Sequence, residues 1–188
     1  MNDHDRWQTR YEVGSPFPTQ PSQVVTALAN RLPKGGRALD VAGGAGRHAV
    51  WLAQQGLNVT LCDLVPNALA RTEELAARAG VTVDTMLLDA ESDPLPDGPW
   101  DVILSFHFLH RPLFGQWQER LTSGGVLIFV QPTVRNLEKH ERPPRRFLLE
   151  EGELARLVED SGLEVLHLEE DWLSDGRHEA CVVARRFQ

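Results

Sequence analysis

The sequence predicts an α/β protein with one doubly wound, Rossmann-like sheet of seven mostly parallel strands, the last of them antiparallel. Three observations lead to this fold class. A glycine-rich turn at residues 42–46 joins a short apolar run to a segment with helical spacing. Strand-like and helix-like segments then alternate along the chain. Two closing strands flank a short turn at residues 174–176, which is typical of an antiparallel pair.

The chain before the first strand is expected to form an arm and a helix. Residues 1–20 are polar and aromatic, carry Trp7 and Tyr11 among others, and show no obvious helix or strand pattern. Residues 21–32 follow with apolar side chains on one helical face. No internal repeat, low-complexity tract or domain boundary is visible. We therefore expect one domain of 188 residues, with the arm followed by a core at residues 21–188.

The later elements follow from apolar runs and turn residues. Prolines at helix starts and glycines at helix ends set most of the expected boundaries, and residues 131–146 look like a loop. The strands are expected at residues 38–41, 57–63, 81–88, 100–105, 126–130, 163–168 and 179–184. The helices after the glycine turn are expected at residues 49–56, 66–78, 113–121 and 147–160.

Composition limits the classes of function. The formal net charge of −8 disfavours nucleic acid or an anionic membrane as a partner. Cys62 and Cys181 lie in predicted strands, so we expect buried free thiols, which suit a reducing cytoplasm. No apolar run approaches the roughly 18 residues of a membrane span, and residues 1–5 lack the apolar core of a signal peptide. A cytoplasmic protein with a small-molecule substrate is expected, and the oligomeric state is not predicted.

Two kinds of cofactor suit the glycine turn. Residues 44–49 fit the dinucleotide fingerprint, and Asp63 stands near the place of a ribose-binding acid. The other candidate cofactor is S-adenosylmethionine, and Asp40 is the residue that distinguishes between the two. A carboxylate there would repel a pyrophosphate but would favour the ammonium and sulfonium of S-adenosylmethionine. The sequence therefore favours S-adenosylmethionine, with an NAD-type oxidoreductase and a ligand-free sheet turn as alternatives.

An ordered set of motifs resembles a known family. The set consists of residues 39–47, Asp63, residues 89–90, residues 100–103 and residues 124–127. It is similar to class I S-adenosylmethionine-dependent methyltransferases. Further matches at residues 7–11 (Trp-Gln-Thr-Arg-Tyr), 111–114 (Arg-Pro-Leu-Phe) and 147–154 resemble the small tellurite-resistance-type group of that family.

The resemblance implies a cofactor site. The glycine turn would support the methionine part, and Asp63 would accept hydrogen bonds from both ribose hydroxyls. Leu64 would lie against the adenine ring, while Asp89 would accept its amino group beside the Ala90 amide. The implied cofactor-binding residues are Arg10, Tyr11, Asp40, Ala42, Gly43, Gly44, Gly46, Arg47, Asp63, Leu64, Asp89, Ala90 and Ser105.

The sequence departs from the family pattern at two places. Ala42 replaces the usual first glycine of the turn, and Gly43 replaces a frequent cysteine. Both residues are small, so cofactor binding is still expected. Residues 130–133 read Val-Gln-Pro-Thr where something like Tyr-Glu-Thr is expected after the fifth strand. That position faces the substrate in such folds, so the identity of the acceptor is left open.

The candidate catalytic residues are His107, His110 and Tyr11. The two histidines follow the fourth strand, at the carboxyl edge where ligands of open α/β sheets bind. They are candidates to order a substrate or accept a proton, and a solvated loop pair is the alternative. No cysteine or third ligand stands at zinc spacing, so no metal is expected. No compelling general base is visible, and none is required for a soft anionic nucleophile.

Residues 135–146, here called the basic loop, carry five cations in an acidic protein. The loop is a candidate for drawing in an anionic substrate, and a solvated loop is an equal alternative. The cations are Arg135, Lys139, Arg142, Arg145 and Arg146.

We therefore expect an S-adenosylmethionine-dependent methyltransferase that acts on a small thiol, oxyanion or similar acceptor by in-line methyl transfer. Two alternatives to a methyltransferase are left open: the NAD-type oxidoreductase and a catalytically silent binding module of the same fold. Residues 1–20 are expected to form a lid over the glycine turn, because their aromatic side chains need a surface to cover.

Overall fold

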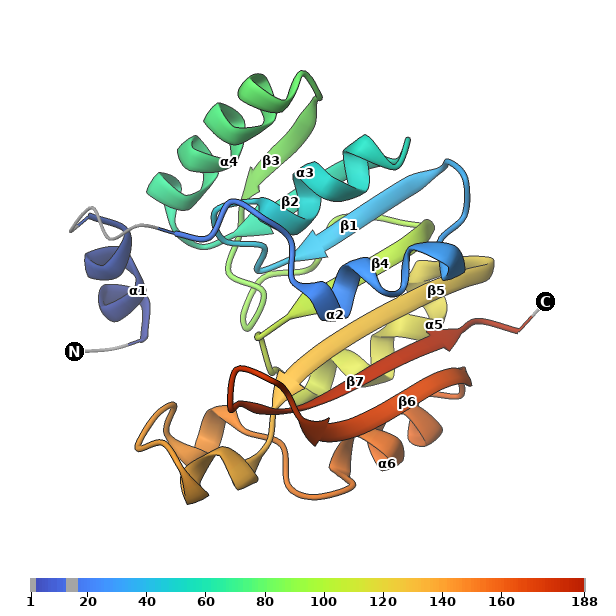
Figure 1. Cartoon of the computed structure of the whole chain (residues 1–188). Coiled ribbons are helices and arrows are strands. Elements are labelled where there is room, and N and C mark those ends of the chain that lie inside the picture. Colours follow the sequence, from blue (N-terminus) through green and yellow to red (C-terminus); the bar gives the residue numbers. More distant parts are fainter. Residues whose placement is uncertain (1–2, 13–16, 188) are drawn as a thin grey trace. The chain divides into compact units, whose positions relative to one another are not determined.

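A computed structural model describes residues 3–12 and 17–187 of the chain (Figure 1). The chain folds into two compact units, Met1–Pro96 and Asp97–Gln188. The strands are β1 (Arg37–Val41), β2 (Asn58–Asp63), β3 (Val83–Leu87), β4 (Trp100–Phe106), β5 (Leu121–Pro132), β6 (Glu164–Trp172) and β7 (His178–Arg185). The α-helices are α1 (Asp3–Glu12), α2 (Gln23–Thr26), α3 (Arg47–Gln54), α4 (Pro66–Ala79), α5 (Trp117–Arg120) and α6 (Glu153–Asp160). The 3-10 helices are η1 (Ala29–Arg31), η2 (Arg111–Gln116), η3 (Val134–Glu138) and η4 (Arg145–Phe147).

The seven strands follow the order β3-β2-β1-β4-β5-β7-β6. Within the first unit, β1 pairs parallel with β2, and β2 pairs parallel with β3. Within the second, β4 pairs parallel with β5, while β7 runs antiparallel to both β5 and β6. This confirms the predicted α/β class and the antiparallel closing strand.

The first unit has the expected alternation of strand and helix. Helices α3 and α4 lie against β2 and β3 (Figure 1). Helix α4 begins at Pro66, whose missing N–H costs nothing in the first turn, and ends at Gly80 in the left-handed conformation. Leu39 and Leu61 are fully buried in the core of this unit. Local capping signals were therefore sufficient to predict the bounds of α4.

The N-terminal segment differs from the prediction. Residues 3–12 form α1, so the expectation of no helix there was wrong, and α1 packs on α4. Trp7 and Tyr11 stand four residues apart, which places them on one helical face. That spacing was the available signal. The helix expected at residues 21–32 is instead a four-residue α2 followed by η1.

The second unit has a core of large apolar side chains. Trp100, Trp117 and Phe129 are each at most 2% exposed. Strand β5 extends beyond its expected ends at both sides and pairs with β7 from Val126 to Pro132. The predicted loop after residue 130 therefore starts with two further strand residues.

The helix expected at residues 147–160 begins only at Glu153. The Leu149 amide donates to the Pro132 carbonyl at 3.1 Å, and the Val134 amide donates to the Leu149 carbonyl at 2.8 Å. These bonds extend the segment before α6 beside the end of β5, so it cannot form helical bonds. Gly152, with φ of 65°, then starts the helix.

Two of the motifs that resemble the tellurite-resistance-type group contact each other. The Arg111 guanidinium donates to both carboxylate oxygens of Glu153, at 2.5 and 2.9 Å, and to the Leu148 carbonyl at 3.2 Å. A bidentate pair of this kind has strong directional preference. It ties η2 to the start of α6.

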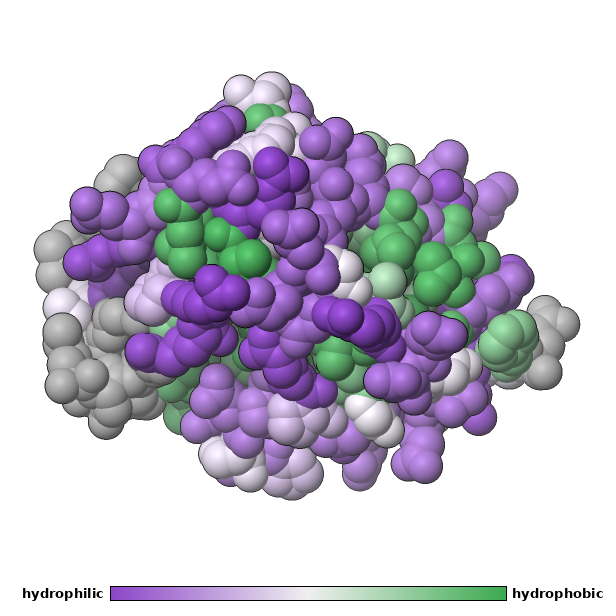
Figure 2. All heavy atoms as spheres, turned by 90° about the horizontal axis from the view of Figure 1, so that it is seen from below, coloured by the Kyte–Doolittle hydropathy of each residue, from purple (hydrophilic) through white to green (hydrophobic). Residues whose placement is uncertain are grey.

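None of the described helices is long and apolar enough to cross a membrane. Figure 2 shows hydrophobic residues on one face of the molecule in small groups among hydrophilic ones.

We predict that Arg111 and Glu153 are energetically coupled. In a double-mutant cycle of Arg111→Ala and Glu153→Ala, urea denaturation should give a coupling free energy of about 1 kcal/mol, since the pair is bidentate but partly exposed to solvent. The exposed pair Arg135–Glu138 is the control and should couple less. Equal coupling in the two cycles would contradict the structural role given to the Arg111 pair.

Candidate functional site

Asp40 lies on β1 two residues before the glycine turn. Its side chain is 1% exposed, and neither carboxyl oxygen has a hydrogen-bond partner among the described residues. A Cβ atom added to Gly43 would lie 2.7 Å from Asp40 Oδ2 and 2.5 Å from Leu61 Cδ1. Position 43 therefore requires glycine, and the turn passes directly beside a buried acid.

The backbone of the turn is left-handed at three positions. The φ angles are 53° at Ala42, 60° at Gly44 and 78° at Gly46. Ala42 is strained there because it carries a Cβ, at a cost on the order of 1 kcal/mol. The Gly43 amide donates to the Cys62 carbonyl at 3.2 Å, which ties the turn to β2.

Asp63 at the tip of β2 holds the turn in place. Its Oδ2 accepts the Gly44 amide proton and its Oδ1 accepts the Val65 amide proton, both at 2.9 Å. Each oxygen still has a free lone pair, so the side chain can accept two further hydrogen bonds from a diol. The sequence predicted Asp63 as a site residue, but it did not predict that the carboxylate fixes the backbone of the turn.

Burial dominates the electrostatics of the two acids. It raises the pKa of Asp40 to about 8, and the negative charge of Asp63 adds to this. The nearby Ala49 amide, which is not in hydrogen-bond geometry with the carboxyl group, and the Arg47 guanidinium act in the opposite direction. Burial also raises the pKa of Asp63, against the hydrogen bonds from the Val65, Gly44 and Leu64 amides. A cation placed beside these acids would favour their ionised forms.

Thr72 of α4 is a contact that sequence reasoning missed. Its hydroxyl lies 3.0 Å from the Gly44 carbonyl and 3.1 Å from the Ala68 carbonyl, so its proton can serve either. Thr72 also fills the space where a Cβ of Gly46 would stand. A single threonine within a predicted helix carries no distinctive signal in the sequence.

Tyr11 of α1 covers the turn. A Cβ added to Gly44 would lie 2.5 Å from the Tyr11 hydroxyl. Burial raises the pKa of Tyr11, as does the charge of Asp63, while the positive charges of Arg10 and Arg71 act against this. The ring stacks on Phe17 with centroids 4.4 Å apart.

Two arginines lie close to the aromatic side chains of the arm. Arg71 of α4 donates to the Tyr11 carbonyl at 3.0 Å, and its guanidinium lies 4.8 Å from the Phe17 ring centre. Arg10 is exposed, with its guanidinium 5.3 Å from the Trp7 ring centre. The arm therefore lies over the turn, as the lid hypothesis requires. Whether it moves stays a prediction, and residues 1–2 and 13–16 of the arm lie outside the described residues.

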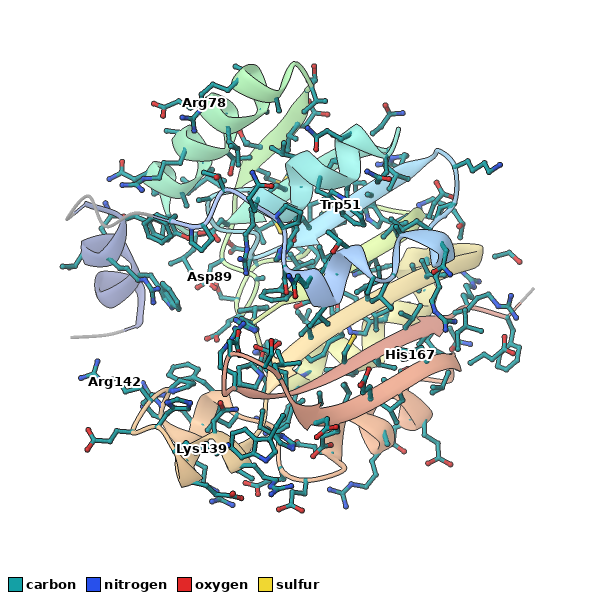
Figure 3. The ribbon with its side chains drawn as sticks, in the orientation of Figure 1. Trp51, Arg78, Asp89, Lys139, Arg142 and His167 are labelled. Atoms are coloured by element: carbon teal, nitrogen blue, oxygen red, sulfur yellow. The ribbon has the colours of Figure 1, made fainter. Side chains whose placement is uncertain are left out.

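The expected adenine contacts have other local roles as well. Asp89 Oδ1 accepts the Glu91 amide proton at 3.0 Å in a turn after β3 (Figure 3). Ala90 is buried, and Leu64 packs with the cluster around Tyr11. Arg47 is the first residue of α3. The cofactor roles of these residues stay predictions.

The candidates of the second unit follow β4. The Ser105 hydroxyl is buried and donates to the Phe108 carbonyl at 3.2 Å. His107 Nε2 lies 2.8 Å from Glu179 Oε1. The His110 side chain makes no hydrogen bond to any residue that the structure describes. The two histidines thus have different surroundings, and Glu179 was missed because it lies 72 residues further along the chain.

Most cations of the basic loop have a partner. Arg135 pairs with Glu138 at 3.0 Å, and Arg145 pairs with Glu150 at 2.6 Å. The Lys139 ammonium lies 3.5 Å from the centre of the Trp172 ring (Figure 3). These contacts offset part of the loop's charge, and its role in drawing in an anionic substrate stays a prediction. Within the described ranges, no three His, Cys, Asp or Glu side chains gather in a group that could hold a metal ion.

Comparison with known proteins identifies the family of the glycine-turn segment. Residues 38–125 match the model of the methyltransferase domain family. This segment is a methyltransferase domain. An uncharacterized protein of Mycobacterium tuberculosis, Rv1403c, is 39% identical over 85 residues. The match covers 45% of this chain, which spans about a third (31%) of that relative's length.

Solved structures share the fold of the methyltransferase domain. An S-adenosylmethionine-dependent methyltransferase from Mesorhizobium loti has a TM-score of 0.71 at 21% identity, over 90% of this chain and 100% of the other. TehB from Haemophilus influenzae has a TM-score of 0.70 at 22% identity, over 97% and 66%. The [4+2]-cyclase SpnF has a TM-score of 0.70 at 19% identity, over 87% and 80%. These structures confirm the fold that the class I resemblance implies, while the cyclase shows that this fold does not define a reaction.

The family of the methyltransferase domain implies S-adenosylmethionine as the cofactor, and the turn fits it. Asp40 offers two unpartnered carboxyl oxygens for a cationic group. Asp63 offers acceptors for ribose hydroxyls, and Gly43 lets the backbone of the turn lie close against the Asp40 side chain. These features lie in the first unit.

The raised pKa of Asp40 predicts a pH-dependent stability. In unfolded chains an aspartate has a pKa of about 3.9, so between pH 4 and 8 Asp40 in the folded protein holds a proton that the unfolded chain releases. Stability should therefore fall as pH rises through this window. Asp40→Asn cannot ionise, so its melting temperature should exceed that of the wild type at pH 8 and approach it near pH 4.

The matched control is Asp84→Asn, since Asp84 is an exposed aspartate on β3. It should shift the melting temperature little at either pH. A variant Asp40→Asn with the same pH dependence as the wild type would show that Asp40 is ionised in the folded protein.

Proposed function

We propose that the protein is an S-adenosylmethionine-dependent methyltransferase that acts on a small-molecule acceptor by in-line methyl transfer. The observation that carries this proposal is the buried carboxyl group of Asp40, unpartnered among the described residues and in contact with the turn. A buried acid without a partner is costly, so its retention at a ligand-binding turn points to a cationic ligand.

When bound, S-adenosylmethionine supplies a methyl group already activated by a sulfonium. The tasks of the chain are then to bind, orient and exclude water. Asp40 balances positive charge at the turn, and Asp63 accepts hydrogen bonds from the ribose hydroxyls. Tyr11 covers the turn from α1, which limits the access of water to it.

The turn argues against a dinucleotide. A pyrophosphate at such a turn takes hydrogen bonds from the loop amides. Here the Gly44 amide already donates to Asp63 Oδ2, and the Tyr11 hydroxyl lies against Gly44. Two acids beside the turn would also repel a phosphate. An NAD-type oxidoreductase is therefore the weaker alternative.

A silent binding module is the second alternative. The unusual residues after β5 are buried: Gln131 donates to the Phe147 carbonyl at 2.6 Å, and the Thr133 hydroxyl lies 2.7 Å from His178 Nδ1. These contacts give the segment a structural role, which does not by itself separate an enzyme from a binding module. Turnover on a panel of acceptors separates them.

Isothermal titration tests the cofactor. S-adenosylhomocysteine should bind and NADH should not. A methyl-transfer assay with thiols, amines and oxyanions then tests the reaction. Binding of NADH alone would favour the oxidoreductase, and binding of S-adenosylhomocysteine without any turnover would favour the silent module.

Asp63→Ala should weaken the binding of S-adenosylhomocysteine by about 1.5–3 kcal/mol, since a charged acceptor of two hydrogen bonds is lost. This corresponds to a Kd about 10- to 150-fold higher. Because Asp63 also holds Gly44 and Val65, Asp63→Asn is the second variant, in which one acceptor oxygen remains. Asp84→Ala is the control. Unchanged affinity in a folded Asp63→Ala variant would remove Asp63 from the cofactor site.

The arm, which residues 1–20 form, should act as a lid over the glycine turn. S-adenosylhomocysteine should protect it from limited proteolysis, and deletion of residues 1–14 should abolish turnover while the fold is retained, because Tyr11 would no longer cover Gly44. Equal cleavage with and without S-adenosylhomocysteine, together with full activity after the deletion, would show that α1 only packs on α4.

A further inference from the structure

Two adjacent residues of α4, Arg71 and Thr72, contact the two segments that meet at Gly44. Thr72 is fully buried and reaches the glycine turn, whereas Arg71 is half-buried and reaches the arm. The arm and the turn meet where the Tyr11 hydroxyl lies against Gly44. All of these residues belong to the first unit.

The Thr72 hydroxyl supplies a hydrogen bond to the Gly44 carbonyl. It has one proton and lies at similar distances from two carbonyl oxygens, 3.0 Å from that of Gly44 and 3.1 Å from that of Ala68. The Ala68 carbonyl stands four residues earlier in α4, where the helical pattern already gives it the amide proton of residue 72. No other group in the described part of the chain donates to the Gly44 carbonyl. The proton is therefore of more use to Gly44 than to Ala68.

Gly44 is held at both of its backbone polar groups. Its amide donates to Asp63 Oδ2 at 2.9 Å, and its carbonyl accepts the Thr72 proton. Its φ of 60° is left-handed, and the Tyr11 hydroxyl lies where a Cβ atom would stand. A glycine without such contacts has wide conformational freedom, so β2, α4 and α1 together fix the backbone of the turn.

The Arg71 guanidinium holds the arm at two points. It donates to the Tyr11 carbonyl at 3.0 Å, in the last turn of α1, where carbonyl groups have no partner within the helix. It also lies 4.8 Å from the centre of the Phe17 ring, which stacks on the Tyr11 ring. These contacts determine where the Tyr11 ring lies, and therefore how its hydroxyl meets Gly44.

We propose that Arg71 and Thr72 are positioning residues for the amino-acid end of S-adenosylmethionine. Thr72 holds the Gly44 carbonyl directly, and Arg71 holds the same glycine through Tyr11. The inference rests on the proposed function, in which the glycine turn supports the methionine part of the cofactor and Asp63 accepts the ribose hydroxyls. Neither residue needs to touch the ligand, because each lowers the cost of ordering the turn when the ligand binds.

The positioning roles predict a selective effect on two ligands. S-adenosylhomocysteine carries the amino-acid end, whereas 5′-methylthioadenosine has the same nucleoside with a methyl group in place of that end. A loosened turn should weaken the binding of the first ligand and leave that of the second unchanged. A general disturbance of α4 would weaken both, because the Val65 amide at the start of this helix is bonded to Asp63.

Each residue has a matched control in the same unit. Thr72→Val removes the hydroxyl at nearly constant shape, and Thr72→Ser retains it. The control is Thr85→Val, since the Thr85 hydroxyl on β3 donates to Glu73 at 2.7 Å. Arg71→Met keeps an apolar stem without the guanidinium, and its control is Arg78→Met, because Arg78 lies in the last turn of the same helix (Figure 3).

Isothermal titration of Thr72→Val should give a Kd for S-adenosylhomocysteine about 3- to 10-fold higher than that of the wild type, as expected for the loss of one neutral hydrogen bond. Thr72→Ser should bind as the wild type does, and Arg71→Met should shift the Kd in the same direction as Thr72→Val. The Kd of 5′-methylthioadenosine should be unchanged in every variant. The two control variants should match the wild type for both ligands.

Two readouts need no ligand. Hydrogen exchange of the Gly44 amide should be faster in Thr72→Val than in Thr85→Val, and a protease should cut the arm faster in Arg71→Met than in Arg78→Met. A wild type that binds neither ligand would overturn the proposed function itself, and these two readouts would still decide whether α4 fixes the turn and the arm. Three results would overturn the positioning roles alone: unchanged affinity for S-adenosylhomocysteine in Thr72→Val and Arg71→Met, equal weakening of both ligands, or a Thr72→Ser variant as weak as Thr72→Val.

Discussion

The two hydrogen bonds that Asp63 accepts hold the candidate cofactor site together. They fix the Gly44 and Val65 amides to the tip of β2, so the turn and the start of α4 share one anchor. Thr72 then joins α4 to the Gly44 carbonyl, and Tyr11 lies against the same glycine. The acid that we propose as the ribose ligand therefore also shapes the turn.

The site is built at a cost in stability. Asp40 is buried without a hydrogen-bond partner among the described residues, and Ala42 and His107 adopt left-handed backbone conformations. Each feature is unfavourable by itself, and the fully buried side chains on neighbouring strands, such as Leu39 and Ile103, offset it. The unfavourable features of the two units stand at strand ends, where α/β proteins bind ligands. Their location at strand ends, rather than how many there are, supports a role in ligand binding.

Sequence prediction failed where tertiary contacts overrode local pattern. Residues 147–149 share helical spacing with residues 150–160, but the backbone groups of Leu149 bond Pro132 and Val134, so α6 starts later. Helix α1 has a weak local pattern, yet Tyr11 finds a surface at Val65 and Ala68. In both places the deciding hydrogen bonds or packing come from residues far along the chain, which local propensity does not report.

The sequence alone determined the alternation of strands and helices, the glycine turn, and the acids Asp40 and Asp63, because each rests on residues close together in the chain. Only the tertiary structure decided that Glu179 meets His107 across 72 residues, and that Tyr11 closes over Gly44. Such meetings depend on strand register and on how a helix docks. Side chains alternate between the faces of a strand, so a shift of one residue in β7 would turn Glu179 away from His107.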